Sequence, residues 1–350
     1  MINRIRRSLA LGILFGALTI SSLPGGVASA QARGPVASAE LLPSWNDGPA
    51  RSAILGYLAR ITTPGPDFVP PAERIAVFDN DGTLWTEQPI YTQFVFAIDR
   101  AADMVAKDPS LRGRPAFAAA ADHDMAALAK LGDAGIMELA VAGEAGLTTE
   151  EFQSVAKAWL AKTHHPRFKT PYTALAYQPE LELLAYLRRA GFKTYIVSGG
   201  EVQFMRTFAE QVYGIPPEQV IGTSLTASFE TRDGEGVVVA QPHLGSLDDG
   251  AGKPVNIALQ IGRAPLIAVG NSDGDLQMLE YSAASARPSL QVLIHHDDAM
   301  REYAYDRQSA VGNLDKALDE AALRGWTVVS MKSDWKMIFP PASDPLPARR

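Results

Sequence analysis

Three short runs of apolar residues, far apart in the chain, each stop at a polar turn. They span residues 74–78, 193–197 and 265–269, and they lead into Asp79-Asn80-Asp81-Gly82, Ser198-Gly199-Gly200 and Gly270-Asn271-Ser272-Asp273. Such runs are typical of buried strands. Helical patterns separate them, which predicts an α/β fold with a doubly wound parallel sheet and helices on both faces. Ligands of such sheets bind beyond the carboxyl ends of the strands, where all three turns fall.

The chain between Asp79 and Ser198 is 118 residues long. A crossover between neighbouring parallel strands needs far fewer residues than this. We therefore predict a helical cap inserted over residues 87–177, with Thr148 as the N-cap of its last helix. The four helices are expected near residues 90–107, 115–131, 134–145 and 149–162.

The remaining residues divide around this insertion. Residues 73–86 and 178–350 are predicted to form the core, and residues 31–72 form a lead-in segment. A smaller interruption holds two β-like stretches, residues 223–231 and 236–241. They flank Asp233-Gly234, so we expect a hairpin there.

The first thirty residues differ from the rest. Three arginines precede an uncharged apolar run, and Ala28-Ser29-Ala30 then supplies a small-residue cleavage pattern. This predicts a secretory signal peptide over residues 1–30 and export to the periplasm or the medium. The alternative is an uncleaved membrane anchor, because no charge occurs from Ser8 to Ala32. Glycine and proline residues in this stretch favour the signal peptide.

Net charge and the lack of cysteine exclude several classes of function. The formal charge of −7 becomes −10 once the three arginines of residues 1–30 are removed. A nucleic acid is therefore an unfavourable partner, and we expect no stable membrane association after signal removal. With no cysteine, the chain cannot form disulfides, thiolate metal sites or a cysteine nucleophile. The sequence does not indicate an oligomeric state.

Asp79 and Asp81 are the first candidates for chemistry. Two residues apart at a strand end, one carboxylate could attack phosphorus while the other donates a proton to the leaving oxygen. For Asp81 to act as an acid, burial or the neighbouring carboxylate must raise its pKa. The simpler alternative is a pair that only shapes the turn.

Ser198 and Lys253 could bind the phosphate. The Ser198 hydroxyl, with the backbone N–H groups near Gly199, precedes a predicted helix N-terminus that could hold an anion. Lys253 opens another helix, where a cation is unfavourable unless an anionic group lies opposite. The simpler alternatives are an ordinary strand-to-helix turn and a solvated lysine.

Asn271, Asp273 and Asp275 form an oxygen-rich cluster after the third apolar run. Side chains of this kind suit Mg²⁺, a hard cation that takes few protein ligands and keeps several waters. The alternative is an N-terminal cap for the helix that follows.

The segment Phe78-Asp79-Asn80-Asp81-Gly82-Thr83-Leu84 resembles closely the DxDGT(L/V) signature of the haloacid dehalogenase-like superfamily, and the four clusters follow in that superfamily's order. The resemblance covers residues 74–295 and implies a Rossmann-like core. It implies that Asp79 is the nucleophile and Asp81 the acid/base, which marks a phosphatase and not a dehalogenase. It further implies phosphate binding by Ser198, Gly199 and Lys253.

The same resemblance implies a Mg²⁺ site formed by the Asp79 carboxylate, the Asp81 backbone oxygen and the last cluster. One residue departs from the family pattern, because Asn271 stands where the first metal-binding carboxylate is expected. We expect Asn271 and Asp275 to share that role with weaker metal affinity, and Asp273 is the alternative.

The place of the insertion and the Ser198-Gly199-Gly200 turn resemble the phosphoserine-phosphatase-like branch, whose caps close over the substrate and exclude water. Glu87 and Gln88 follow the first motif and could line the substrate pocket. An acid there would suit a substrate amino group. We interpret His164-His165 and His295-His296-Asp297-Asp298 as polar surface, since adjacent residues diverge on a strand or helix.

These observations together favour a Mg²⁺-dependent phosphatase that hydrolyses phosphate monoesters of small metabolites through an aspartyl-phosphate, with phosphoserine-like compounds among the candidate substrates. Two alternatives stay open. The chain could transfer the phosphoryl group to an alcohol, or it could be a catalytically inactive binding protein that keeps the fold.

Overall fold

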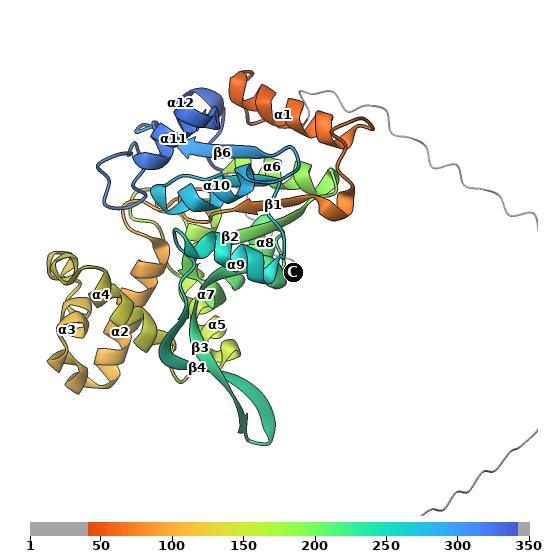
Figure 1. Cartoon of the computed structure of the whole chain (residues 1–350). Coiled ribbons are helices and arrows are strands. Elements are labelled where there is room, and N and C mark those ends of the chain that lie inside the picture. Colours follow the sequence, from red (N-terminus) through yellow and green to blue (C-terminus); the bar gives the residue numbers. More distant parts are fainter. Residues whose placement is uncertain (1–40, 342–350) are drawn as a thin grey trace, which may run out of the picture. The chain divides into compact units, whose positions relative to one another are not determined.

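The computed structural model describes residues 41–341 (Figure 1). The predicted signal peptide, and the membrane anchor that is its alternative, lie outside the described residues. Among the helices of residues 41–341, none combines the length and the apolar composition that a bilayer crossing requires.

Seven strands form one sheet in the order β4-β3-β2-β1-β5-β6-β7. All neighbouring pairs are parallel except β3 and β4. Strands β2, β3 and β4 follow one another on one side of β1, and β5, β6 and β7 follow one another on its other side. This order confirms the predicted doubly wound α/β fold. The strands are β1 (Ile75–Phe78), β2 (Lys193–Glu201), β3 (Val220–Arg232), β4 (Glu235–Ser246), β5 (Ile267–Gly270), β6 (Leu290–His295) and β7 (Thr327–Ser330).

Helices cover both faces of this sheet. Alternate residues of β1 point to opposite sides: Ala76 and Phe78 belong to one apolar cluster, and Ile75 and Val77 to another. Helices α1, α6, α7 and α8 contribute to the first cluster, and α9, α10 and α11 to the second. Their bounds are α1 (Pro49–Thr62), α6 (Gln178–Arg189), α7 (Val202–Arg206), α8 (Ala209–Tyr213), α9 (Gly252–Gln260), α10 (Leu276–Ala283), α11 (Lys316–Arg324) and, at the end, α12 (Met331–Asp334).

Four α-helices lie between β1 and α6, within the predicted insertion: α2 (Thr92–Lys107), α3 (Pro115–Ala121), α4 (Met125–Glu144) and α5 (Thr149–Leu160). Helices α2, α3 and α4 share an apolar cluster of their own. Helix α5 contributes Phe152 and Leu160 to the sheet's first cluster instead. The predicted helix over residues 115–131 is wrong in extent, because the chain leaves helical geometry after Ala121 and again at Gly132, where φ is +61°.

The cap of α5 and the hairpin are confirmed. Thr148 Oγ1 accepts a hydrogen bond from the Glu151 amide at 3.1 Å, and the Glu151 carboxylate accepts one from the Thr148 amide at 2.8 Å. Strands β3 and β4 pair antiparallel around Asp233 and Gly234, which both have positive φ. Backbone hydrogen bonds of Ala240 to Gly146 and Leu147 join this hairpin to the turn between α4 and α5.

Candidate active site

Lys253 joins two of the predicted acids. Its Nζ donates to Asp79 Oδ1 at 2.8 Å and to Asp275 Oδ1 at 2.6 Å. Asp79 directly follows β1, Lys253 lies in α9 and Asp275 precedes α10, so three distant segments meet at one edge of the sheet. Lys253 is only 2% exposed, and the alternative of a solvated surface lysine is therefore wrong.

Asp275 accepts four hydrogen bonds. Its Oδ2 accepts from the amides of Asn271 and Ser272, at 3.0 and 3.1 Å, and from the Ser272 hydroxyl at 3.2 Å. Three donors thus share the two lone pairs of Oδ2, while Oδ1 accepts from Lys253 at 2.6 Å. The geometry therefore makes Asp275 an anchor for Lys253.

Asp79 and Asp81 are held by different partners: the cation Lys253 bonds Asp79, and the neutral indole of Trp85 bonds Asp81. Burial, followed by the charge of Asp275, raises the pKa of Asp79, and Lys253 counteracts both. Burial also raises the pKa of Asp81, although Trp85 Nε1 donates to its Oδ1 at 2.8 Å. Of the two causes that the sequence left open for Asp81, burial is the dominant one. A carboxyl group that keeps its proton can act as a general acid.

Ser198 lies at this edge, but the predicted anion site at a helix N-terminus is not free. Ser198 is buried in β2, and its Oγ accepts a hydrogen bond from the Gly200 amide at 3.3 Å. The Glu201 carboxylate accepts from the amides of Gln203 and Phe204, at 2.7 and 2.6 Å, and so caps α7 itself. The N–H groups that open this helix are therefore taken, and the Ser198 hydroxyl and Gly199 remain as phosphate-binding candidates.

Asp273 has a structural position. One of its oxygens accepts from the amides of Asp315 and Ala317, both at 2.9 Å, and the other accepts from the Lys316 amide at 3.1 Å. These amides belong to the start of α11, so Asp273 caps that helix. Its carboxylate is thus engaged away from Asp79.

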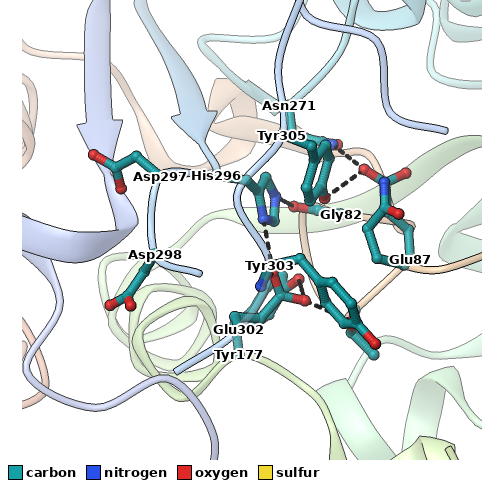
Figure 2. A network of polar contacts seen from close by, with 12 residues as sticks. Gly82, Glu87, Tyr177, Asn271, His296, Asp297, Asp298, Glu302, Tyr303 and Tyr305 are labelled. Carbon is teal, nitrogen blue, oxygen red and sulfur yellow. Dashed lines mark hydrogen bonds and ion pairs between the residues drawn. The ribbon is translucent and has the colours of Figure 1, made fainter. Parts of the chain in front are cut away.

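Asn271 and Glu87 form a buried pair behind the first motif. Asn271 Oδ1 accepts from the Thr83 hydroxyl at 2.9 Å, and its Nδ2 donates to Glu87 Oε1 at 2.7 Å. The Tyr305 hydroxyl donates to the same Glu87 oxygen at 2.7 Å (Figure 2). Burial, then the charges of Asp81 and Asp79, raises the pKa of Glu87 well above its usual value, while the bonds from Tyr305 and Asn271 oppose this.

A second buried group holds the backbone of the first motif. His296 Nε2 donates to the Gly82 carbonyl at 2.7 Å, and its Nδ1 lies 3.3 Å from Glu302 (Figure 2). The Thr86 hydroxyl donates to Glu302 at 2.7 Å. Burial opposes the charge of Glu302, but the bonds from His296 and Thr86 outweigh it, and the pKa of Glu302 falls below its usual value.

The prediction that the two histidine clusters are polar surface is therefore wrong for His296, which is 2% exposed, and for His165, which is fully buried. His165 donates from Nε2 to the Gln88 carbonyl at 2.7 Å. Asp298 is buried as well, whereas His164 is exposed as expected.

One cavity of about 570 Å³ opens from the catalytic edge. Its polar end is lined by Asp79, Asp81, Glu87, Ser198, Gly199 and Lys253. Much of the rest is apolar and comes from the insertion and the hairpin, including Phe94, Ile136, Met137, Val141, Leu225 and Leu244. Gln88 does not line it, contrary to expectation, because its amide donates to the Val311 carbonyl at 2.9 Å.

The side-chain atoms at the polar end that could bind a metal ion are all oxygen atoms of Asp79, Asp81, Glu87 and Ser198. Within residues 41–341, no group of three or more His, Asp or Glu side chains is arranged to hold a metal ion. Mg²⁺ does not require such a group, because it is bound by one or two carboxylates with waters and substrate phosphate. The donor chemistry at this edge therefore fits that ion.

Tyr305, Gly312, His296 and Glu302 were not predicted as parts of the site. They belong to residues 296–315, which follow β6 and reach back to the first motif. Nothing in their local sequence signals this, since the pairing of Tyr305 with Glu87 spans 218 residues.

Comparison with known proteins gives one family and several distant structures. Residues 76–280 match the sequence profile of the family described as haloacid dehalogenase-like hydrolase. No curated protein matches the chain. A conserved protein of unknown function from Anaerococcus prevotii is 15% identical, with a TM-score of 0.47 over 80% of this chain and 91% of that one. A phosphoserine phosphohydrolase-like protein from Francisella tularensis is 15% identical, with a TM-score of 0.36 over 72% of this chain and 99% of that one.

Proposed function

This chain belongs to the haloacid dehalogenase-like hydrolase family, and from that premise we propose that it is a Mg²⁺-dependent phosphatase that hydrolyses phosphate monoesters through Asp79. One observation carries the proposal: buried Lys253 bonds Asp79 at 2.8 Å and Asp275 at 2.6 Å. A buried cation held against the nucleophile can neutralise the charge that otherwise repels an attacking carboxylate from a phosphate ester.

The reaction proceeds in two steps. In the first, an Asp79 oxygen attacks phosphorus, the ester P–O bond breaks, and Asp81 gives its proton to the leaving oxygen. In the second, Asp81 takes a proton from a water molecule, whose oxygen attacks phosphorus and breaks the bond to Asp79. Inorganic phosphate leaves, and both carboxyl groups return to their starting forms. The Ser198 hydroxyl binds a non-reacting phosphate oxygen.

The expected Mg²⁺ ion would be held by the Asp79 carboxylate and the Asp81 backbone oxygen, with position 271 as the family's third ligand position. When bound, the ion neutralises negative charge on the phosphate oxygens. Asp275 is assigned to Lys253 in this proposal, because one of its oxygens accepts from Lys253 and the other from three donors of residues 271 and 272. Asp273 is assigned to the cap of α11.

The volume and the lining of the cavity determine which leaving groups it can hold. Its volume of about 570 Å³ lies within the ordinary range of small-molecule sites. The apolar lining from the insertion and the hairpin favours an organic phosphate with an apolar portion. Glu144 also lines the cavity, and its carboxylate has no hydrogen-bond partner among residues 41–341. It could accept a substrate ammonium group, so phosphoserine-like esters remain candidates. Export, which rests on residues 1–30, stays part of the proposal.

The test is hydrolysis of an aryl phosphate by the purified protein with Mg²⁺ and with a chelator. We expect turnover that requires the cation and is abolished in Asp79→Asn. The matched control is Asp233→Asn, which makes the same change of charge at an exposed acid in the hairpin turn. Equal turnover by wild type and Asp79→Asn would refute the mechanism.

Two further outcomes separate the alternatives. An alkyl phosphate that accumulates when an alcohol is added would identify phosphoryl transfer in place of hydrolysis. A folded protein that turns over no phosphate ester in a broad panel, with Mg²⁺ present, would identify an inactive binding protein.

A further inference from the structure

Asn271 stands where the family has a metal-binding carboxylate, and its amide is already engaged at both ends. Its oxygen accepts from Thr83 at 2.9 Å and its nitrogen donates to Glu87 at 2.7 Å. Asn271 is 1% exposed and is not among the residues that line the catalytic cavity. The side chain at position 271 therefore holds neighbouring groups and does not face the reacting atoms.

Glu87 faces the cavity instead. It lines the polar end together with Asp79 and Asp81, although it is only 2% exposed. Both of its hydrogen bonds, from Asn271 and Tyr305, fall on Oε1. Its Oε2 has no hydrogen-bond donor in the part of the chain that the structure describes. On a side chain that lines the cavity, a carboxylate oxygen with unused lone pairs beside two other carboxylates is available to a cation.

The fold makes specific room for this carboxylate. A Cβ atom on Gly312 would lie 1.9 Å from Glu87 Oε1, and one on Gly82 would lie 2.3 Å from the same oxygen. Both glycines have positive φ, so each position also disfavours a side chain by its backbone. Two segments far apart in the sequence thus lack side chains where the Glu87 carboxyl group sits.

The segment that leads into Glu87 is also held by hydrogen bonds. Figure 2 shows His296 bonded to the Gly82 carbonyl and Glu302 beneath it. Glu302 accepts from Thr86, the residue immediately before Glu87. This arrangement keeps the Glu87 side chain in one place without adding a donor to its free oxygen.

The geometry points to Glu87 as the carboxylate ligand that replaces the family's acid at position 271, with Asn271 as the residue that positions it. This inference rests on the proposed function, because the ion is the Mg²⁺ of that mechanism. It moves one ligand from the end of β5 to the segment after β1, so that Asp79, Asp81 and Glu87 all come from a single stretch of chain.

The experiment is calorimetric titration of Mg²⁺ and Mn²⁺ into chelator-treated protein, with the ion-induced shift in melting temperature as a second readout. Glu87→Gln is the informative variant, because the amide oxygen can still accept from Asn271 and Tyr305 while the charge is lost. We expect its affinity for the ions to fall by more than about 100-fold, because loss of an outer-shell partner alone typically costs about 10- to 100-fold. Glu150→Gln, at an exposed position of α5, is the matched control and should bind as wild type does.

A second pair of variants separates ligation from positioning. Tyr305→Phe removes one bond to Glu87 but keeps its carboxylate, so its affinity should fall much less than that of Glu87→Gln. The double variant Glu87→Gln with Asn271→Asp moves the charge to position 271, where the family has its carboxylate. Because this position does not line the cavity, the affinity of the double variant for the ions should stay low.

The outcomes are distinct. Wild-type affinity in folded Glu87→Gln would overturn the inference and leave the phosphatase proposal intact. Recovery of wild-type affinity in the double variant would also overturn it, because position 271 would then face the ion. A wild-type protein that hydrolyses phosphate esters without binding either ion would remove the metal from the proposed function itself.

Discussion

Replacing Lys253 by methionine removes the cation between Asp79 and Asp275 and keeps an unbranched side chain of similar length. The two acceptor oxygens lie 2.8 and 2.6 Å from Nζ, so they are at most 5.4 Å apart. At an effective dielectric constant of about 20, two unit charges at this separation repel each other by roughly 3 kcal/mol. Breaking a buried ion pair on one side typically costs about 3–5 kcal/mol, which agrees with this value.

The sign of the pH dependence follows from the same contacts. Burial and the charge of Asp275 already raise the pKa of Asp79 to about 8, and the loss of Lys253 raises it further. The extra instability of the variant is therefore complete only well above pH 8, and it is relieved as the pH falls below that value. We expect a loss of about 3 kcal/mol in the free energy of unfolding at about pH 10, and a clearly smaller loss at about pH 6.

The assay is urea denaturation of wild type and Lys253→Met at both pH values with a chelator present. Lys130→Met is the control, since Lys130 is exposed on α4 and makes no ion pair with any of residues 41–341. The double variant with Asp275→Asn should recover part of the loss, because one of the two repelling charges is gone. A loss below about 1 kcal/mol at about pH 10, the size expected for an exposed pair, would refute the reasoning.

Three further predictions concern stability. Glu180 is fully buried, both its carboxylate oxygens lack partners in the described chain, and burial raises its pKa to about 8. The free energy of unfolding should therefore fall as the pH rises from about 4 to 8, and Glu180→Gln should remove this pH dependence and gain roughly 1–3 kcal/mol at pH 9 in urea denaturation. An unchanged pH profile in the variant would contradict the prediction. Thr148→Ala should lose about 1 kcal/mol by the same measurement while Thr148→Ser stays near wild type, and equal losses would argue against the cap. His296→Phe leaves Glu302 buried without its main donor and should lose roughly 3 kcal/mol; adding Glu302→Leu should reduce the loss, and an equal or greater loss would count against the pairing.

The catalytic edge could be predicted because its signals are local. An apolar run that stops at a polar turn marks a strand end, and parallel strands bring such ends together. Asp79, Ser198 and Lys253 therefore came out of the sequence without any knowledge of contacts. The cap at Thr148 and the turn at Asp233 were equally readable, since each depends on residues within four positions.

The parts that could not be predicted depend on long-range contacts. His165 and His296 are polar, and only the segments that pack over them make them buried. Glu87 was predicted near the substrate, but its partners Asn271 and Tyr305 lie 184 and 218 residues further along the chain. One wrong prediction, the free anion site at the N-terminus of α7, could have been avoided from a local signal. Glu201 directly precedes α7, and an acid at that position can cap a helix and occupy the amides expected for phosphate.

Residues 296–315 are needed to complete the contacts of the first motif, and they are synthesised late. During synthesis the first motif leaves the ribosome early, and Asp79 can meet Lys253 once α9 and β5 have emerged. The partners of Gly82 and Glu87, which are His296 and Tyr305, emerge only after β6. A nascent chain can thus contain every motif residue before the segment that bonds Gly82 and Glu87 has been synthesised.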